Sequence, residues 1–215
     1  MDSMTACAPA SSAGRQEGGT EVGPVRRLRR AERREQILAA ATRAFARAGF
    51  TATSLDDIAA EAGITRVILY RHFESKADMY RAVLDRACTR LAETVGTGDY
   101  GEDAIAVLVR AAAADPDAFR LLFRHAAREP EFRDQADALT AASAEVARRD
   151  LAAQIPVGPW LDWAARLIPA LAIEAVIAWL DAGQPEPGQA ADRIGQVIQG
   201  AIQAAKPAEQ RQPSR

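Results

Sequence analysis

The sequence is poor in the residues on which catalysis, metal binding and disulfide bonding depend. Among 215 residues it has two cysteines and two histidines. Cys7 and Cys88 cannot form a disulfide framework, so we expect reduced thiols in a cytoplasmic protein. His72 and His125 fall in different parts of the chain, and no glycine-rich phosphate loop, HExxH or CxxC sequence occurs. The sequence therefore predicts no enzyme, no metal site and no cofactor.

A long uninterrupted apolar run is also missing. The longest, residues 167–180, contains Pro169 and Glu174, whereas a membrane-spanning helix needs about 20 apolar residues. Residues 1–25 are rich in Gly, Ser, Ala and Pro and lack the apolar centre of a signal peptide. We expect a disordered tail at 1–25 and no association with a membrane.

The net charge of −2 hides an uneven distribution along the chain. Residues 25–90 hold 14 Lys and Arg against 8 Asp and Glu, whereas residues 91–215 hold 12 against 18. A basic first third attached to an acidic body predicts that the first third binds a polyanion and that the body has another task.

The spacing of apolar residues predicts helices and no strand. Apolar positions recur with the helical period, as at Ile37, Leu38, Ala41 and Phe45, and nowhere after Leu91 do they alternate as in a strand. We expect an all-α protein of about nine helices. Its predicted divisions are a disordered tail (1–25), a three-helix unit with a basic N-terminal arm (26–75), a helical bundle (76–204) and a frayed tail (205–215).

Local signals within 26–75 predict a helix-turn-helix unit. Gly49 is placed to end the first helix in a left-handed conformation. Thr53 and Ser54 each precede an aspartate by three residues, as in a capping box that opens the second helix. Gly63 then ends that helix, and Thr65 is the expected N-cap of the third. Two short helices joined by a glycine-containing turn form the helix-turn-helix motif.

The third helix separates into two faces when its residues are spaced by 100°. Leu69 and Phe73 face inward with Ile64, and a mixed basic, aromatic and aliphatic set faces outward. Arginines pair with guanine, and aliphatic side chains contact thymine methyl groups, so this face suits the major groove of DNA. The outward residues are Arg66, Val67, Ile68, Tyr70 and Arg71.

Residues 34–84, REQILAAATRAFARAGFTATSLDDIAAEAGITRVILYRHFESKADMYRAVL, resemble the DNA-binding domain of TetR-family transcriptional regulators. The resemblance is carried, in order and with matching gaps, by Ile37, Ala40, Ala41, Phe45, Gly49, Thr53, Ser54, Ile58, Ala59, Ala62, Gly63, Ile64, Leu69, Tyr70, Phe73, Ser75 and Lys76. Val67 departs from the family, in which a small residue or proline is common there.

The resemblance implies roles for individual residues. Arg66, Val67, Ile68 and Arg71 would read bases, while Thr53, Tyr70, His72 and Lys76 would contact the DNA backbone. Ser54 and Thr65, at the starts of the second and third helices, complete the predicted DNA-binding set. Two alternatives stay open: His72 as a packed histidine and Tyr70 as a core tyrosine.

A run of arginines precedes the first helix, and two interpretations of it stay open. It is either a solvated tail or helix start, or a flexible arm that enters the minor groove and makes binding sensitive to salt. The arginines are Arg26, Arg27, Arg29, Arg30, Arg33 and Arg34.

Aromatic residues gather unevenly in the body, again with two interpretations. They are either ordinary core residues or the lining of a mostly apolar pocket for a small apolar or amphipathic effector, with Arg124 or His125 fixing its orientation. Pro169 should kink its helix. The predicted pocket residues are Phe119, Phe123, Arg124, His125, Trp160 and Trp163.

Two apolar helices, predicted at 160–182 and 189–204, suggest contact with a second copy. A helix that is apolar nearly all round must be buried on more than one side. The family resemblance implies a four-helix interface in a homodimer, which would present two reading helices to a palindromic site. The predicted interface residues are Leu171, Ala175, Trp179, Ile194, Val197, Ile198 and Ile202.

The sequence thus predicts a homodimeric, ligand-responsive repressor that binds double-stranded DNA. The helix expected at 75–92 would connect the DNA-binding unit to the pocket. The alternative is an architectural or division-type DNA-binding factor without an effector, which a fully packed body would favour.

Overall fold

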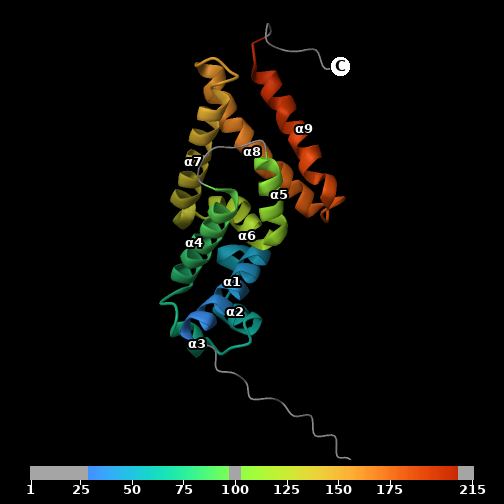
Figure 1. Cartoon of the computed structure of the whole chain (residues 1–215). Coiled ribbons are helices and arrows are strands. Elements are labelled where there is room, and N and C mark those ends of the chain that lie inside the picture. The colour runs from blue at the N-terminus through green and yellow to red at the C-terminus, as the bar shows by residue number, and fades with distance from the viewer. Residues whose placement is uncertain (1–28, 97–102, 208–215) are drawn as a thin grey trace, which may run out of the picture.

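The computed structural model describes residues 29–96 and 103–207, and within these ranges it contains helices only (Figure 1). This confirms the predicted all-α class. The first three helices are α1 (Arg30–Ala52), α2 (Leu55–Glu61) and α3 (Arg66–Tyr70). The remaining α-helices are α4 (Lys76–Val95), α5 (Ala104–Ala114), α6 (Pro116–Arg120), α7 (Arg133–Leu151), α8 (Pro159–Asp181) and α9 (Pro187–Ala205). Between α6 and α7 lie a π-helical segment, η1 (Leu121–His125), and two 3-10 turns, η2 (Ala126–Arg128) and η3 (Pro130–Phe132).

Helices α1–α3 form one end of the molecule and α7–α9 the other, with α4, α5 and α6 between them (Figure 1). The predicted local signals operate at the first end. Gly49 has φ 76° and bends the chain out of the first helical stretch of α1. The Ser54 hydroxyl accepts a hydrogen bond from the Asp57 N–H at 3.1 Å, and the Asp57 carboxylate accepts one from the Ser54 N–H at 2.9 Å. This reciprocal capping box fixes the start of α2.

Two apolar cores stabilise these ends. The first core joins α1–α3 to α4, η1 and η3, and it includes Phe45, Tyr80 and Phe132. The second lies among α5, α7, α8 and α9. Leu91 of α4 and Phe123 of η1 pack against both cores. Packing therefore continues from the N-terminal unit into the body instead of stopping near residue 76.

Helix α8 has the length and apolar composition to cross a membrane, and 44% of its most apolar window is buried inside the protein. It packs between α7 and α9, with Leu161, Ala164 and Ile177 buried in the second core. This packing is that of a core helix of a globular domain.

Candidate DNA-binding surface and cavity of the body

Helix α3 presents a short, mixed face at the end of the molecule formed by α1–α3. Leu69 and Phe73 are buried beneath it, as predicted. Thr65, Arg66 and Arg71 are exposed, together with two large residues, Val67 at 63% and Tyr70 at 51% exposure. Tyr70 is thus not a core tyrosine. Ile68 is half-buried and packs against the first core, so it lies at the edge of the exposed face.

Arg66 is held in place by its neighbours. Its Nη1 lies 3.3 Å from Oδ2 of Asp56 in α2, and its Nη2 donates to the Tyr70 hydroxyl at 3.1 Å. Its guanidinium carbon lies 5.6 Å from the centre of the Tyr70 ring. These contacts orient the guanidinium across the junction of α2 and α3, which reduces the conformational freedom it would lose on binding.

Thr53 does not have the role that the resemblance implies. Its side chain is buried, and its hydroxyl lies 2.7 Å from the Gly49 carbonyl oxygen and 3.2 Å from the Ala44 carbonyl oxygen. The hydroxyl therefore closes the end of α1 and is unavailable to a phosphate, so the predicted contact through this side chain is wrong. Ser54, the N-cap of α2, is exposed.

Lys76 is also turned inward. Its ammonium donates to the carbonyl oxygens of Phe50 at 2.8 Å and Thr53 at 3.0 Å, and it lies 4.5 Å from the centre of the Phe50 ring. A longer contact reaches the Thr51 carbonyl oxygen at 3.4 Å. Cations stabilise the carbonyl end of a helix. The side chain thus joins the start of α4 to the end of α1 in the free protein, and the phosphate contact of its ammonium stays a prediction.

His72, just after α3, is half-buried. Its pKa lies below the ordinary value of 6.5 because burial disfavours the charged ring, and Arg30, Arg34 and Arg33 add repulsion. The neutral imidazole keeps one N–H that can be donated but adds no charge to the surface. Its partial burial favours the packed-histidine alternative.

Most of the arginine run in the described part of the chain is helical. Arg30, Arg33 and Arg34 lie in the first turns of α1, so the prediction of a flexible minor-groove arm is wrong for these three. Arg33 donates to Gln36 at 2.8 Å, and the Arg34 guanidinium lies 4.9 Å from the Phe73 ring centre.

Arg29 is the N-cap of α1. Arg26 and Arg27 lie outside the described residues.

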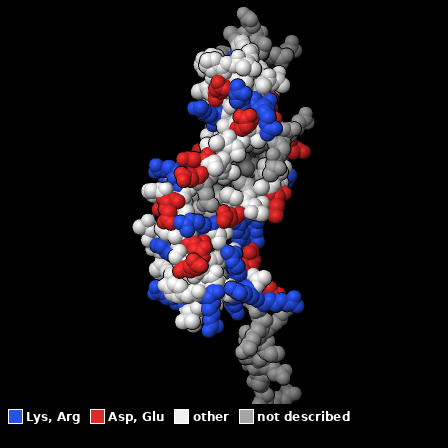
Figure 2. Space-filling model, turned by 90° about the vertical axis from the view of Figure 1, so that its left-hand side faces the viewer, with Lys and Arg blue, Asp and Glu red and all other residues white. Residues whose placement is uncertain are grey.

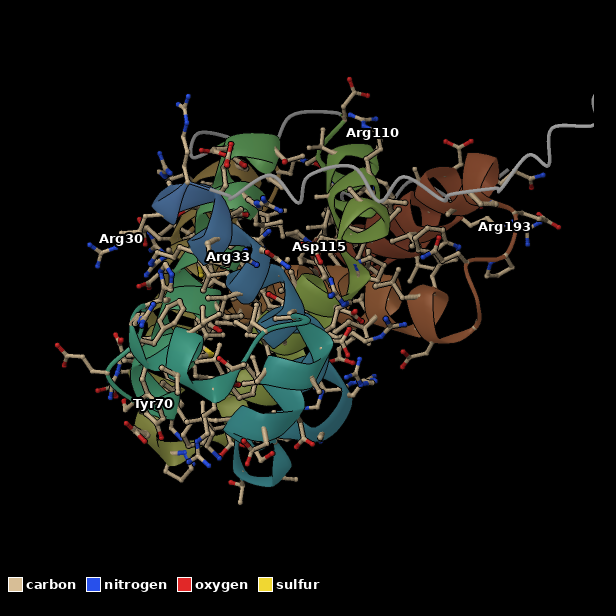
Figure 3. All side chains as sticks on the ribbon, turned by 90° about the horizontal axis from the view of Figure 1, so that it is seen from below. Arg30, Arg33, Tyr70, Arg110, Asp115 and Arg193 are labelled. Carbon is tan, nitrogen blue, oxygen red and sulfur yellow. The ribbon has the colours of Figure 1, made fainter. Side chains whose placement is uncertain are left out.

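Basic side chains gather at the end of the molecule that carries α3 (Figure 2). The view along the long axis shows Arg30 pointing outward from α1 and Tyr70 at the periphery of the same end (Figure 3). The predicted basic region is therefore a surface, at the end of the molecule that carries α3, as well as a stretch of sequence.

The body contains a cavity of about 490 Å³. Its wall comes from α4, α5, α7, α8, α9 and Phe123. Phe123 is the single predicted pocket residue in this wall; Phe119 lies behind it in the second core, with ring centres 4.7 Å apart. Lining residues include Cys88, Leu91, Val95, Ile105, Leu108, Leu139, Ala142, Ser143, Val146, Asp150, Gln154, Ile168, Pro169, Ile173, Ile198 and Gln199.

Four predicted pocket residues lie elsewhere, and for them the prediction is wrong. Arg124 pairs with Asp181 at 2.7 Å, at the end of α8. His125 hydrogen-bonds to the backbone of Ala46 in α1. Trp160 and Trp163 are 65% and 44% exposed, pack edge to face at 5.6 Å, and do not line this cavity. Trp160 instead borders a separate cleft of about 420 Å³ between the start of α8 and the end of α9.

Sequence reasoning missed the wall that α7 supplies. Leu139, Ala142, Val146 and Asp150 recur every three or four residues and face the cavity. The signal was present as a helical stripe, but it is made of small and mixed residues that carry no recognisable chemistry.

The predicted interface residues divide into two groups. Trp179, Ile194, Ile198 and Ile202 are buried within their own chain, so the interface prediction is wrong for these four. Val197 is 54% exposed, and Leu171 and Ala175 are half-buried. The outward surface of α8 and α9 also carries Trp163, Ala170, Glu174, Ala178, Gly200 and Ala204.

The fold and the exposed α3 surface define an all-α helix-turn-helix protein. Residues 37–83 match the family model described as bacterial regulatory proteins, tetR family. The chain is 43% identical over 81 residues to the transcriptional activator FasR of Mycolicibacterium smegmatis, a match covering 38% of this chain and 36% of FasR. The match to this curated relative thus spans about a third of its length.

The likeness to solved structures extends over most of the chain. A TetR-like transcriptional regulator from Rhodococcus sp. RHA1 is similar with a TM-score of 0.71 and 24% identity, covering 82% of this chain and 98% of that one. The structure of a SmeT–triclosan complex is similar with a TM-score of 0.57 and 22% identity, covering 85% and 96%. Residues 37–83 thus carry the DNA-binding domain of the TetR family of regulators, and the likeness over the remainder of the chain is one of fold.

Proposed function

We propose that the protein is a homodimeric repressor that binds a palindromic DNA operator and leaves it when a small apolar or amphipathic effector occupies the body's cavity. One observation carries this proposal. Helix α4 begins at the DNA-binding unit, where the Lys76 ammonium bonds to the end of α1, and its last turns form part of the cavity wall. The same rigid element therefore touches both sites.

The contacts at the two ends of α4 support a transfer of motion. Lys76 fixes the first turn to α1, so a rotation of α4 carries the helix-turn-helix unit with it. Leu91 and Val95 line the cavity, so an effector that displaces them displaces α4. The effector shifts the equilibrium only by its differential affinity for the two arrangements.

A second connection runs through η1. Phe123 lines the cavity, and His125, two residues later, hydrogen-bonds to the backbone of Ala46 in α1. A π-helical turn is an irregular hydrogen-bonding pattern that often occurs at functional sites. Movement of the Phe123 ring would therefore reach α1 directly.

The outward surface of α8 and α9 supports the homodimer. Trp163, Ala170 and Val197 are exposed apolar residues on these two helices, and burying them against a second copy would remove them from water. A two-fold axis along the molecule would bring both α3 surfaces to one face of DNA, so the operator would be palindromic.

Repression requires only that the dimer occupy its operator and leave it. FasR is named an activator, so activation is the alternative that the experiment must distinguish. The architectural alternative requires a body without an effector, whereas this body holds a cavity of about 490 Å³. SmeT, whose structure is similar, is complexed with triclosan.

The test uses the full chain, an operator obtained by selection from random DNA, and 1-decanol as a neutral amphipathic probe. Decanol should weaken operator binding at least tenfold in fluorescence anisotropy, and operator occupancy should lower transcription in a reconstituted reaction.

Ala142→Phe, which fills the cavity, should abolish the response to decanol and preserve DNA binding. Ala141→Phe, on an exposed neighbouring position outside the lining, is the matched control. Raised transcription from the occupied operator would contradict repression.

A further inference from the structure

Among the described residues, the cavity wall contains an acidic side chain and no basic one. Most of its residues are apolar, and its polar side chains include Ser143, Asp150, Gln154 and Gln199. Among the described residues that line the cavity there is one acid, Asp150, and no lysine, arginine or histidine. An anionic effector would therefore lose its hydration without meeting a counter-charge.

Basic residues of the surrounding helices are engaged outside the cavity. Arg86 and Arg90 of α4 pair with Glu35 at 2.6 and 2.7 Å. Arg148 of α7 pairs with Asp162 at 2.9 Å, and Arg124 pairs with Asp181 as described above. Arg110 of α5 and Arg149 of α7 are exposed and are not part of the lining. None of these cations is among the described residues that line the cavity.

We propose that the effector site selects an amphipathic cation, with its apolar part among Leu91, Leu108 and Ile173 and its positive group near Asp150. This inference rests on the proposed function, because it concerns the same cavity. A carboxylate can accept several hydrogen bonds at once, so Asp150 can attract a cation while it contacts other groups.

The test compares three probes that share a decyl tail: decyltrimethylammonium, 1-decanol and decanoate. Dissociation constants are measured on the full chain by displacement of a neutral fluorescent probe, below the concentration at which each compound forms micelles. Decyltrimethylammonium should bind at least tenfold more tightly than decanol, and decanol more tightly than decanoate. Equal or tighter binding of decanoate would overturn the inference, as would failure of all three probes to bind.

Two substitutions separate the charge from the shape of the site. Asp150→Asn should remove the advantage of decyltrimethylammonium and leave the decanol affinity unchanged, which also shows that the variant is folded. Gln154→Glu adds a negative charge to the lining, so it should tighten the binding of decyltrimethylammonium and weaken the binding of decanoate. If the three probes bind Asp150→Asn in the same order and with the same ratios of dissociation constants as the unchanged protein, the inference is wrong. The proposed function fails separately, if bound probes leave operator affinity unchanged.

Discussion

The ammonium of Lys76 lies 2.8 Å from the carbonyl oxygen of Phe50, and this contact joins the first turn of α4 to the end of α1. The ammonium also reaches the Thr53 carbonyl oxygen at 3.0 Å and the Phe50 ring. Its function in the free protein is therefore to stabilise the junction of α1, α2 and α4, which sets the angle at which the helix-turn-helix unit leaves the body.

Lys76→Met should lower the free energy of unfolding by about 1–3 kcal/mol, because it keeps the aliphatic stem and leaves half-buried carbonyl groups without their charged donor. Denaturant titration of the full chain measures this change. Arg71→Ala is the control: Arg71 is exposed at the end of α3, so its loss should weaken DNA binding and leave stability unchanged. The opposite result would be an unchanged stability of Lys76→Met and a DNA affinity whose salt dependence is smaller by about one released counterion. That result would show that Lys76 contacts a DNA phosphate.

Arg66→Ala should relax base preference at a single operator position, by about 1–3 kcal/mol of discrimination. Tyr70→Phe removes the hydroxyl that accepts from the Arg66 Nη2, so it should cause a smaller loss at the same position because the guanidinium is less well oriented. Affinities for the operator and its single-base variants measure both effects. A uniform loss across all variants for Arg66→Ala would assign Arg66 to the DNA backbone instead.

Tyr80→Phe should raise the free energy of unfolding by about 1 kcal/mol, since an unsatisfied buried hydroxyl costs stability. Tyr80 is fully buried against Phe45 and Phe132, and its hydroxyl has no hydrogen-bond partner among the described residues. Tyr70→Phe, at an exposed position, should leave stability unchanged. A loss of stability in Tyr80→Phe would mean that the hydroxyl is bonded in solution.

Stability should fall as the pH drops below 6.5, and His125 should supply part of this decrease. Burial lowers the pKa of His125 below 6.5, Arg128 and Arg124 lower it further, and Glu129 and the Ala46 backbone oppose them. The unfolded chain then binds more protons than the folded chain between pH 6.5 and the folded-state pKa, so stability present above 6.5 is lost across that window. His125→Gln should flatten the decrease in denaturant titrations at several pH values, with His72→Gln removing a separate part. An unchanged pH profile in the His125 variant would show that the ring titrates normally.

Local chemistry made much of the N-terminal unit predictable. The positive φ of Gly49, the capping box of Ser54 and Asp57, and the inward side of Leu69 each depend on a few neighbouring residues. Thr53 and Lys76 could not be assigned in this way, because their partners are carbonyl groups at the end of α1. A hydroxyl or ammonium near a helix start bonds to DNA or to its own chain according to tertiary placement, which spacing does not encode.

The body was less predictable for a related reason. Trp160 and Trp163 were expected inside because large aromatic residues dominate cores, yet they lie on the exposed surface of α8. The cavity is instead bounded in part by small residues such as Ala92, Ala142 and Ala172, which leave space that larger side chains would fill. The apolar stripe of α9 through Ile194, Ile198 and Ile202 packs within its own chain, and its pattern does not distinguish that partner from a second copy.

Selection of bound sequences from a random DNA library examines sequence reading by α3 and the proposed dimer in one experiment. We expect enrichment of a two-fold symmetric site. In a parallel selection with the Arg66→Ala variant, one base position in each half-site should lose its preference. Enrichment of a single unrepeated half-site would contradict the dimeric arrangement. Absence of any enriched sequence would contradict sequence-specific binding through α3.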